Sequence, residues 1–304
     1  MNDRNHPGVG GLITQQRLEF DDTGLLRLPS AISEPQVSAM RENLWTELAQ
    51  KYHFRPDAPE AWCEGPVFGL QHVGRAGGFA GMMSPALCAA LDDLFAPDGW
   101  ERPSQWGTPL VTFPFRGRRW EVPHQTWHLD VYGGLGVQQT LAEVTVFAFL
   151  DSVCAEGGAT MAVIGTHRLI HELSAGRKAK LRSADGRRLL AKTHPWLRDL
   201  WSEEGSETRK QRFMEEGAVV HGVPVKVVEI TGRAGDIVVM HSSVLHTPSL
   251  NFRGKPRIVV RQSVYRAKGP VNSDWRIADV LGGHCATMPC EPAEIRWVQG
   301  PPRR

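Results

Sequence analysis

The stretch that decides the fold is Glu143-Val-Thr-Val-Phe-Ala-Phe-Leu-Asp151. β-Branched and aromatic residues fill it, and this composition is typical of a strand. Side chains of a strand point alternately to opposite faces, so Thr145, Phe147 and Phe149 would share one face. The stretch therefore predicts a strand with two distinct faces.

Similar strand patterns surround this stretch on both sides. They are expected at residues 109–115, 120–130, 159–164, 225–230, 236–240 and 257–265, with a short strand at 20–28 that contains a turn at 21–24. Two helices precede most of these strands. One begins with the capping pair Ser33 and Gln36, and the other with Ser84 and Pro85. Helices followed by many strands predict a mainly β fold, an antiparallel sandwich or barrel.

The 304 residues are expected to form a single domain, 1–304, with its core at 18–266. Residues 171–216 differ from the rest, because charges of both signs are dense and strand-forming residues are sparse. We expect a helical insertion there, which is either lid-like or a solvated excursion of the surface. Residues 267–304 are predicted to form a C-terminal tail.

Composition excludes several classes of protein. The net charge is +2, so no basic field indicates a nucleic-acid partner. No apolar run approaches the roughly 20 residues that span a bilayer, so no membrane partner is expected. The first residues carry no signal segment, and the five cysteines suggest no disulfide framework. A cytoplasmic location is the expectation, and ferrous iron would survive there.

The chemistry is indicated by Trp127-His128-Leu129-Asp130. In an extended strand, His128 and Asp130 point to one face. An imidazole and a carboxylate are two of the three ligands in the facial triad that binds non-haem Fe(II). A His-x-Asp pair is frequent by chance, so its weight depends on a second histidine. His246 follows a predicted strand and is the candidate, with His241 as a competitor in the same stretch.

Arg257 follows His246 by eleven residues, across a turn rich in Asn, Gly and Pro. A hairpin would return it toward the metal ligands. A guanidinium forks onto carboxylates better than any other side chain. Arg257 is therefore expected to bind the far carboxylate of a 2-oxo acid, 2-oxoglutarate, that chelates the metal.

These motifs together resemble the phytanoyl-CoA dioxygenase family, whose members are Fe(II)- and 2-oxoglutarate-dependent oxygenases. The resemblance covers roughly residues 18–266, from the N-terminal helix through Glu156-Gly157-Gly158 and Gly165-Thr166-His167 to Arg257. It implies a double-stranded β-helix (jelly-roll, cupin-like) core. The roles it implies are iron ligands at His128, Asp130 and His246, cosubstrate contacts at Arg257, Thr145 and Gln125, and a structural His167.

The sequence also departs from the family pattern. Two residues after His246, where the family often has a small hydroxyl that holds the cosubstrate, stands Pro248. Thr247 is adjacent but would point the other way in a regular strand. Related halogenases replace the metal carboxylate by a small residue, so Asp130 argues against halogenation.

The expected reaction consumes Fe(II)-bound 2-oxoglutarate and O2, releases succinate and CO2, and oxidises an unactivated carbon of a substrate, with hydroxylation as the default outcome. The expected substrate is a small molecule of the specialised-metabolite class, and the protein is expected to be a monomer or homodimer. The expected walls of its pocket are Trp127, Tyr132, Gln139 and Met240.

Two other functions fit the same residues. A cupin-like metal oxygenase or isomerase would use the metal without 2-oxoglutarate, so it would not need Arg257. A non-catalytic jelly-roll binding module would keep His128, Asp130 and His246 for structural reasons alone.

Overall fold

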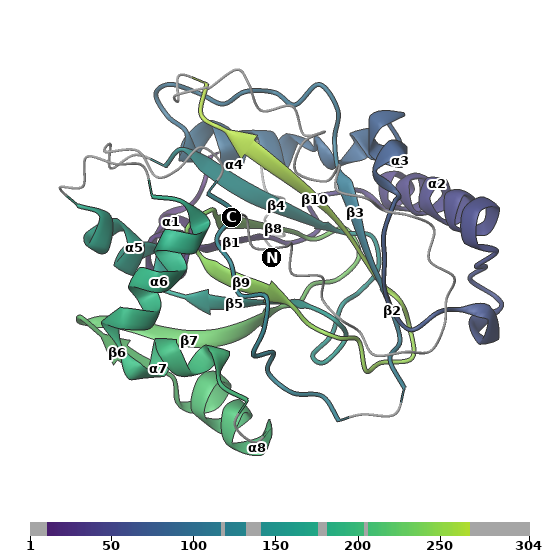
Figure 1. The fold of residues 1–304 in the computed structure, drawn as a ribbon. Helices are drawn as coiled ribbons and strands as arrows, with labels where there is room; N and C mark the ends of the chain where they lie inside the picture. Colours follow the sequence, from purple (N-terminus) through teal and green to yellow (C-terminus); the bar gives the residue numbers. More distant parts are fainter. Residues whose placement is uncertain (1–10, 117–118, 132–140, 176–180, 204–205, 268–304) are drawn as a thin grey trace, which may run out of the picture. The chain divides into compact units, whose positions relative to one another are not determined.

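The computed structural model describes residues 11–116, 119–131, 141–175, 181–203 and 206–267, which lie in the unit Met1–Gly269. Its strands form two antiparallel sheets, a large one in the order β1-β8-β4-β10-β3-β2 and a small one in the order β6-β7-β5-β9 (Figure 1). The large sheet contains β1 (Leu25–Leu28), β2 (Gly65–Val67), β3 (Thr108–Phe113), β4 (Glu143–Phe149), β8 (Ile237–His241) and β10 (Arg257–Tyr265). The small sheet contains β5 (Thr160–Ile164), β6 (Ala218–Val220), β7 (Val223–Ile230) and β9 (Leu245–Pro248).

The two sheets face each other across a shared apolar interior. Phe147 of β4, Met240 of β8 and Val259 of β10 meet Ala162 of β5 and Ile230 of β7 in one buried cluster. Phe149 lies on the same inner face of β4 as Phe147, as its alternation predicts. The arrangement is a jelly-roll core, so the predicted fold class is confirmed.

The outer face of the large sheet is covered by helices from the N-terminal part of the chain: α2 (Glu34–Tyr52), α3 (Gln71–Arg75) and α4 (Pro85–Leu94). Both predicted helix starts are confirmed. The Gln36 side chain accepts the Ser33 backbone N–H at 3.3 Å, and the Ser84 hydroxyl accepts the Leu87 N–H at 3.2 Å. Leu44 of α2 is fully buried against this sheet. We call α2 and α4 the N-terminal cover.

The strand predicted at 20–28 is wrong in its first half. Residues Thr14–Thr23 form helix α1, and only Leu25–Leu28 form a strand. Gly24 adopts a left-handed φ of 77°, and its N–H donates to the Phe20 carbonyl. The Gly that suggested a turn therefore ends a helix, because glycine serves both purposes equally well.

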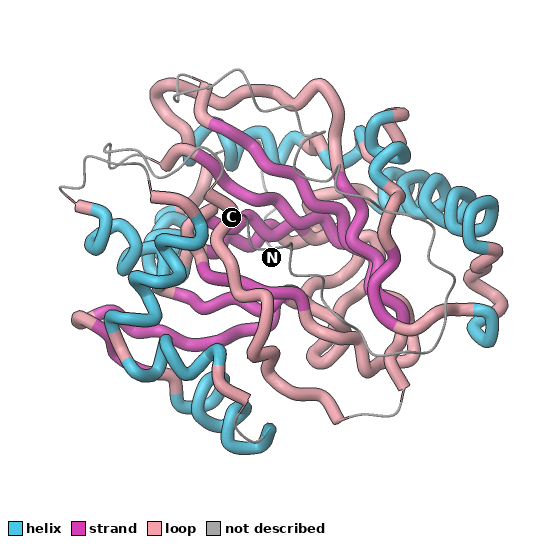
Figure 2. The backbone as a smooth tube through the Cα atoms, viewed as in Figure 1, coloured by secondary structure: helices cyan, strands magenta, loops and turns pink. Residues whose placement is uncertain are grey.

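Helices also cover the outer face of the small sheet (Figure 2). They are α5 (Thr166–Ser174), α6 (Ser183–Thr193), α7 (Pro195–Arg198) and α8 (Ser206–Arg209), followed by a π-helix at Lys210–Glu216. Leu190, Trp196 and Phe213 bury their side chains against Val225 and Val227 of β7. The residues of 171–216 that are described thus form a packed layer, which we call the insertion cover. None of the described helices is both long and apolar enough to cross a membrane.

The strand predicted at 120–130 is mostly irregular. Its only ladder contact among the described residues is a bridge between His128 and His246. Thr126 has a φ of 59°, which a regular strand does not allow. The carbonyls of Val122 and Pro123 instead accept hydrogen bonds from the buried Arg209 guanidinium, at 3.1 and 3.0 Å. Side-chain donors from the insertion cover replace strand partners here, which the sequence pattern could not show.

Candidate metal centre

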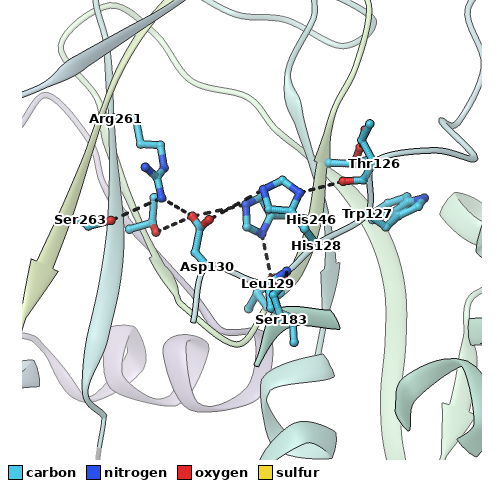
Figure 3. A network of polar contacts seen from close by, with 12 residues as sticks. Thr126, Trp127, His128, Leu129, Asp130, Ser183, His246, Arg261 and Ser263 are labelled. Atoms are coloured by element: carbon cyan, nitrogen blue, oxygen red, sulfur yellow. Dashed lines mark hydrogen bonds and ion pairs between the residues drawn. The ribbon is translucent and has the colours of Figure 1, made fainter. Parts of the chain in front are cut away.

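Three predicted ligands converge inside the barrel. The ligand atoms of His128, Asp130 and His246 all lie within 4.8 Å of one another (Figure 3). The His128 Nε2 is 3.8 Å from one carboxylate oxygen of Asp130, and the His246 Nε2 is 3.5 Å from the other. Asp130 and His246 are buried, whereas the His128 side chain is 41% exposed. The group is therefore reached from the side of His128.

Backbone pairing holds the three residues together. His128 and His246 exchange N–H···O=C bonds of 2.8 and 3.0 Å, and the Asp130 N–H donates to the Ser242 carbonyl at 3.0 Å. Residues 128–130 thus lie along β9 and the turn that precedes it. The side chains at 128 and 130 project to the same side, which is the reason for the His-x-Asp spacing.

The backbone also fixes both imidazole rings. The Nδ1 atom of His128 lies 2.8 Å from the Thr126 carbonyl, and the Nδ1 atom of His246 lies 3.0 Å from the Val244 carbonyl. A carbonyl can only accept, so each Nδ1 carries the proton. Each Nε2 then presents a lone pair toward Asp130, as a metal ligand must.

The protonation states also suit a cation. Burial raises the pKa of Asp130, but electrostatic interactions with His246 and Arg261 outweigh this effect and hold the pKa well below its usual range. Burial, with the nearby His246, lowers the pKa of His128 to about 4. An ionised carboxylate beside a neutral imidazole is the state in which both can bind a divalent metal.

Arg257 lies deeper in the same interior. Its side chain is buried, and one Nη donates to the Thr160 hydroxyl at 3.0 Å. Its Nε is buried without a hydrogen-bond partner among the described residues, and burial lowers the pKa of this guanidinium to about 10. Thr160 pairs with Pro248, and two residues along the same strands Ala162 pairs with His246. Residues two apart on a strand are separated by roughly 7 Å. The Arg257 guanidinium therefore contacts Thr160 about 7 Å along the sheet from the pair that contains His246.

Two functional candidates were missed by sequence reasoning. Thr160 supplies a hydroxyl next to Arg257, where the sequence offers only Pro248 at the usual position. Arg261 donates to Asp130 Oδ2 at 2.5 Å. It lies four residues after Arg257 on β10, so strand alternation already places both arginines on one face.

Of the other residues considered in the sequence analysis, Thr145 and Met240 lie on the inner face near Asp130, whereas Thr247 does not. The Thr145 hydroxyl donates to Asp130 Oδ2 at 3.0 Å, and Met240 pairs with Thr145 on the neighbouring strand, buried on the same inner face. The Thr247 hydroxyl accepts from or donates to Thr126 at 2.6 Å and donates to the Gln125 carbonyl at 3.0 Å. Thr247 therefore points away from the interior, as its alternation predicts.

Trp127 and Gln125 are not brought to the three ligands. The Trp127 indole is fully buried in the insertion cover, on the other side of the segment from His128, and its Nε1 donates to the Pro123 carbonyl. The exposed Gln125 side chain contacts His124 instead. Tyr132 and Gln139 lie outside the described residues.

His241, the competitor of His246, belongs to a different cluster. Its ring lies 5.2 Å from the ring of His167 and 6.0 Å from that of Phe20. It follows Met240 on β8, so it projects to the opposite face of that strand. Burial lowers its pKa to about 3. The structure thus separates His241 from the metal ligands.

Helix α6 supports the metal-binding segment from the side opposite β9. The Leu129 N–H donates to the Ser183 hydroxyl at 3.1 Å, and the Arg187 guanidinium donates to the Trp127 carbonyl at 3.4 Å. These two bonds flank His128. Gly186 permits this approach, because a Cβ there would lie 2.4 Å from a methyl carbon of Leu129. The insertion cover therefore contacts the backbone of the metal ligands directly.

The donor set suits iron. Two imidazole nitrogens and one carboxylate on one face, with further positions open, form the arrangement that non-haem Fe(II) oxygenases use. Residues 20–259 match the sequence model of phytanoyl-CoA dioxygenase (PhyH). The chain belongs to the phytanoyl-CoA dioxygenase family. As a member of this family it is an iron- and 2-oxoglutarate-dependent oxidoreductase.

Solved structures share the fold at low sequence identity. HygX from Streptomyces hygroscopicus, with nickel and 2-oxoglutarate bound, is 15% identical with a TM-score of 0.51, over 88% of this chain and 90% of that one. HygX with iron bound is 14% identical with a TM-score of 0.50, over the same shares. No curated protein matches the sequence. The likeness to HygX supports the fold of this family member.

Proposed function

We propose that this protein hydroxylates an unactivated carbon of a small molecule, while 2-oxoglutarate is converted to succinate and CO2. The observation that carries the proposal is the convergence of His128, Asp130 and His246, with each Nε2 facing the carboxylate. HygX, which shares the fold, holds nickel and 2-oxoglutarate in its solved structure. By analogy, we propose that this chain also binds a divalent metal ion and 2-oxoglutarate.

In the proposed site, His128, Asp130 and His246 hold the iron. Arg257 binds the far carboxylate of 2-oxoglutarate, because its buried Nε has an unused donor and its only described side-chain partner is the neutral Thr160 hydroxyl. Burying a carboxylate there would relieve the cost of an unpaired guanidinium. Thr160 replaces the hydroxyl that Pro248 cannot supply.

When bound, iron with 2-oxoglutarate and O2 supplies the oxidising power for attack on a C–H bond. The chain's own residues bind, orient and exclude water. Met240 and Phe147 provide apolar walls on the inner face of the large sheet. Because His128 is the exposed ligand, the substrate would approach along its ring. Trp127 and Gln125 are not included in the proposed pocket.

The proposal also covers the substrate, the partners and the cellular location. We propose a small specialised metabolite as substrate, no nucleic-acid or membrane partner, and a monomer or homodimer in the cytoplasm. A reducing compartment would preserve both ferrous iron and the thiols of described cysteines such as Cys88 and Cys154.

The test is succinate formation by the purified protein with Fe(II), 2-oxoglutarate, O2 and a panel of candidate metabolites. The wild type should release succinate, and Asp130→Ala should release none. Arg257→Met should raise the KM for 2-oxoglutarate about 10- to 100-fold, since a hydrogen bond to a charged group contributes about 1.5–3 kcal/mol. Release of an oxidised product without succinate, insensitive to Arg257→Met, would favour a cupin-like enzyme. Wild-type protein that binds no iron would favour a binding module.

A further inference from the structure

The two oxygens of the Asp130 carboxylate have unequal surroundings. Oδ2 accepts hydrogen bonds from the Thr145 hydroxyl at 3.0 Å and from the Arg261 guanidinium at 2.5 Å. Oδ1 lies 3.8 Å from His128 Nε2, and Oδ2 lies 3.5 Å from His246 Nε2. The carboxylate is 3% exposed, so these contacts are made with little water present. Both oxygens thus lie near a ligand nitrogen, but among the described residues Thr145 and Arg261 both donate to Oδ2.

The two donors come from the most regular part of the barrel. Thr145 lies on β4 and Arg261 on β10, and these strands pair along seven residue pairs, from Val259↔Phe149 to Tyr265↔Glu143. Asp130, in contrast, lies in an irregular segment, two residues after the bridge between His128 and His246 of β9. Arg261 of the large sheet therefore extends across the interior and binds Asp130, whose segment pairs with β9 of the small sheet (Figure 3).

We propose that Arg261 and Thr145 are positioning residues: their hydrogen bonds to Oδ2 of Asp130 fix the carboxylate so that Oδ1 is free to bind the metal. The proposal rests on the proposed function of the three ligands. A carboxylate that binds through one oxygen leaves more of the metal's positions for 2-oxoglutarate and O2 than one that binds through both. Partners that orient a ligand in this way commonly change metal affinity 10- to 100-fold when they are removed.

This role of Arg261 has an opposite alternative. A guanidinium 2.5 Å from the metal carboxylate also repels a divalent cation. If Arg261 were only the counter-ion of Asp130 in the metal-free protein, its removal would make the metal bind more tightly. If Arg261 positions Asp130, its removal would make the metal bind more weakly. The sign of the change in metal affinity therefore separates the two roles.

The experiment is a titration of the metal-free full-length protein with Co(II), followed by calorimetry and by the visible ligand-field spectrum. Arg261→Met and Thr145→Val, which keep similar volume, should each raise the Kd for Co(II) about 10- to 100-fold and alter the Co(II) spectrum. Arg261→Lys should restore part of the affinity. Arg41→Met is the matched control, because Arg41 is also partly buried and pairs with a carboxylate, Asp151, away from the site; it should leave the Kd unchanged.

Wild-type or tighter Co(II) binding by Arg261→Met, with an unchanged spectrum in Thr145→Val, would overturn the positioning role. If Arg261→Met does not fold, which circular dichroism would show, Thr145→Val decides alone by the same criteria. Failure of the proposed function looks different: either the wild type binds no Co(II), or Asp130→Ala binds it as well as the wild type.

Discussion

The N-terminal cover and the insertion cover bury the outer faces of the two sheets with similar apolar side chains, but they stand in different relations to the site. The N-terminal cover packs on the large sheet through a cluster that includes Leu44 of α2 and Leu91 of α4. The insertion cover packs on the small sheet and also bonds to the backbone on both sides of His128, through Ser183 and Arg187. One cover stabilises the barrel, whereas the other stabilises the barrel and the metal-binding segment together.

This difference follows from the geometry of the two sheets. The large sheet is regular where it meets its cover, so its backbone groups are satisfied by neighbouring strands. The segment before Asp130 has β9 on one side only, and α6 supplies donors and acceptors on the other. An unpaired strand edge must be covered, and here the cover is the part of the chain that sequence reasoning treated as an insertion.

The largest expected effect comes from truncating a core leucine in each cover. Leu44→Ala and Leu190→Ala remove fully buried side chains, so each should reduce the free energy of unfolding by about 2–5 kcal/mol. Only Leu190→Ala, on α6, should also raise the Kd for Co(II), since it loosens the helix that holds residues 127–129. Thermal melts and Co(II) titrations below the melting temperature measure both. Equal Co(II) affinities in the two variants would contradict the claim that only the insertion cover stabilises the metal-binding segment.

The next effect concerns the contact between α1 and α5, the helix that leads into the insertion cover. His167 of α5 is buried, its Nε2 donates to the Asp21 carbonyl at 3.0 Å, and burial lowers its pKa to about 4. Between about pH 6.5 and pH 4 the unfolded chain binds a proton that the folded chain does not. Stability from this group is therefore complete above about pH 6.5 and declines as the pH falls toward 4, by at most about 3 kcal/mol.

The measurement is chemical denaturation of the metal-free wild type and of His167→Gln from pH 7 to pH 4. Gln can still donate to the Asp21 carbonyl, so the variant removes the titration but keeps a donor. The difference in stability between the two proteins should shrink or reverse toward pH 4. Parallel pH profiles would show that His167 does not carry this dependence.

The smallest expected effect is that of one bond from α6. Ser183→Ala removes the acceptor of the Leu129 N–H, and a hydrogen bond contributes about 0.5–1.5 kcal/mol. The Kd for Co(II) should rise roughly 2- to 10-fold. Arg188→Ala is the control on the same helix, because Arg188 is exposed and pairs with Asp185; its affinity should equal that of the wild type. If Arg188→Ala also bound Co(II) more weakly, the loss would come from a general change in helix α6 and not from the bond between Ser183 and Leu129.

Much of the fold could be predicted from the sequence because its periodic patterns are local. The alternation at 143–151 and the capping residues Ser33 and Ser84 each determine an element without help from distant residues. The strand at 120–130 could not be judged in this way. Its backbone carbonyls at Val122 and Pro123 accept from Arg209, which is 87 and 86 residues away, and no local pattern records such a partner.

The same distinction applies to the site. His128, Asp130, His246 and Arg257 follow from spacing and from the family resemblance, and the structure places them in one interior. Arg261 and Thr160 were missed because each acts across the barrel on a residue far away in sequence. Trp127 was expected to line the pocket, but its side chain packs in the insertion cover, because adjacent residues of an extended segment face opposite ways.

The central claim is that His128, Asp130 and His246 bind one iron ion beside a 2-oxoglutarate held by Arg257. Its most direct test is an anaerobic titration of the metal-free protein with Fe(II) and then with 2-oxoglutarate, followed by calorimetry and visible absorption. We expect one Fe(II) and one 2-oxoglutarate to bind per chain, with a charge-transfer band that needs both ligands and is lost in His246→Ala. Wild-type binding of Fe(II) and the same band in His246→Ala would contradict it.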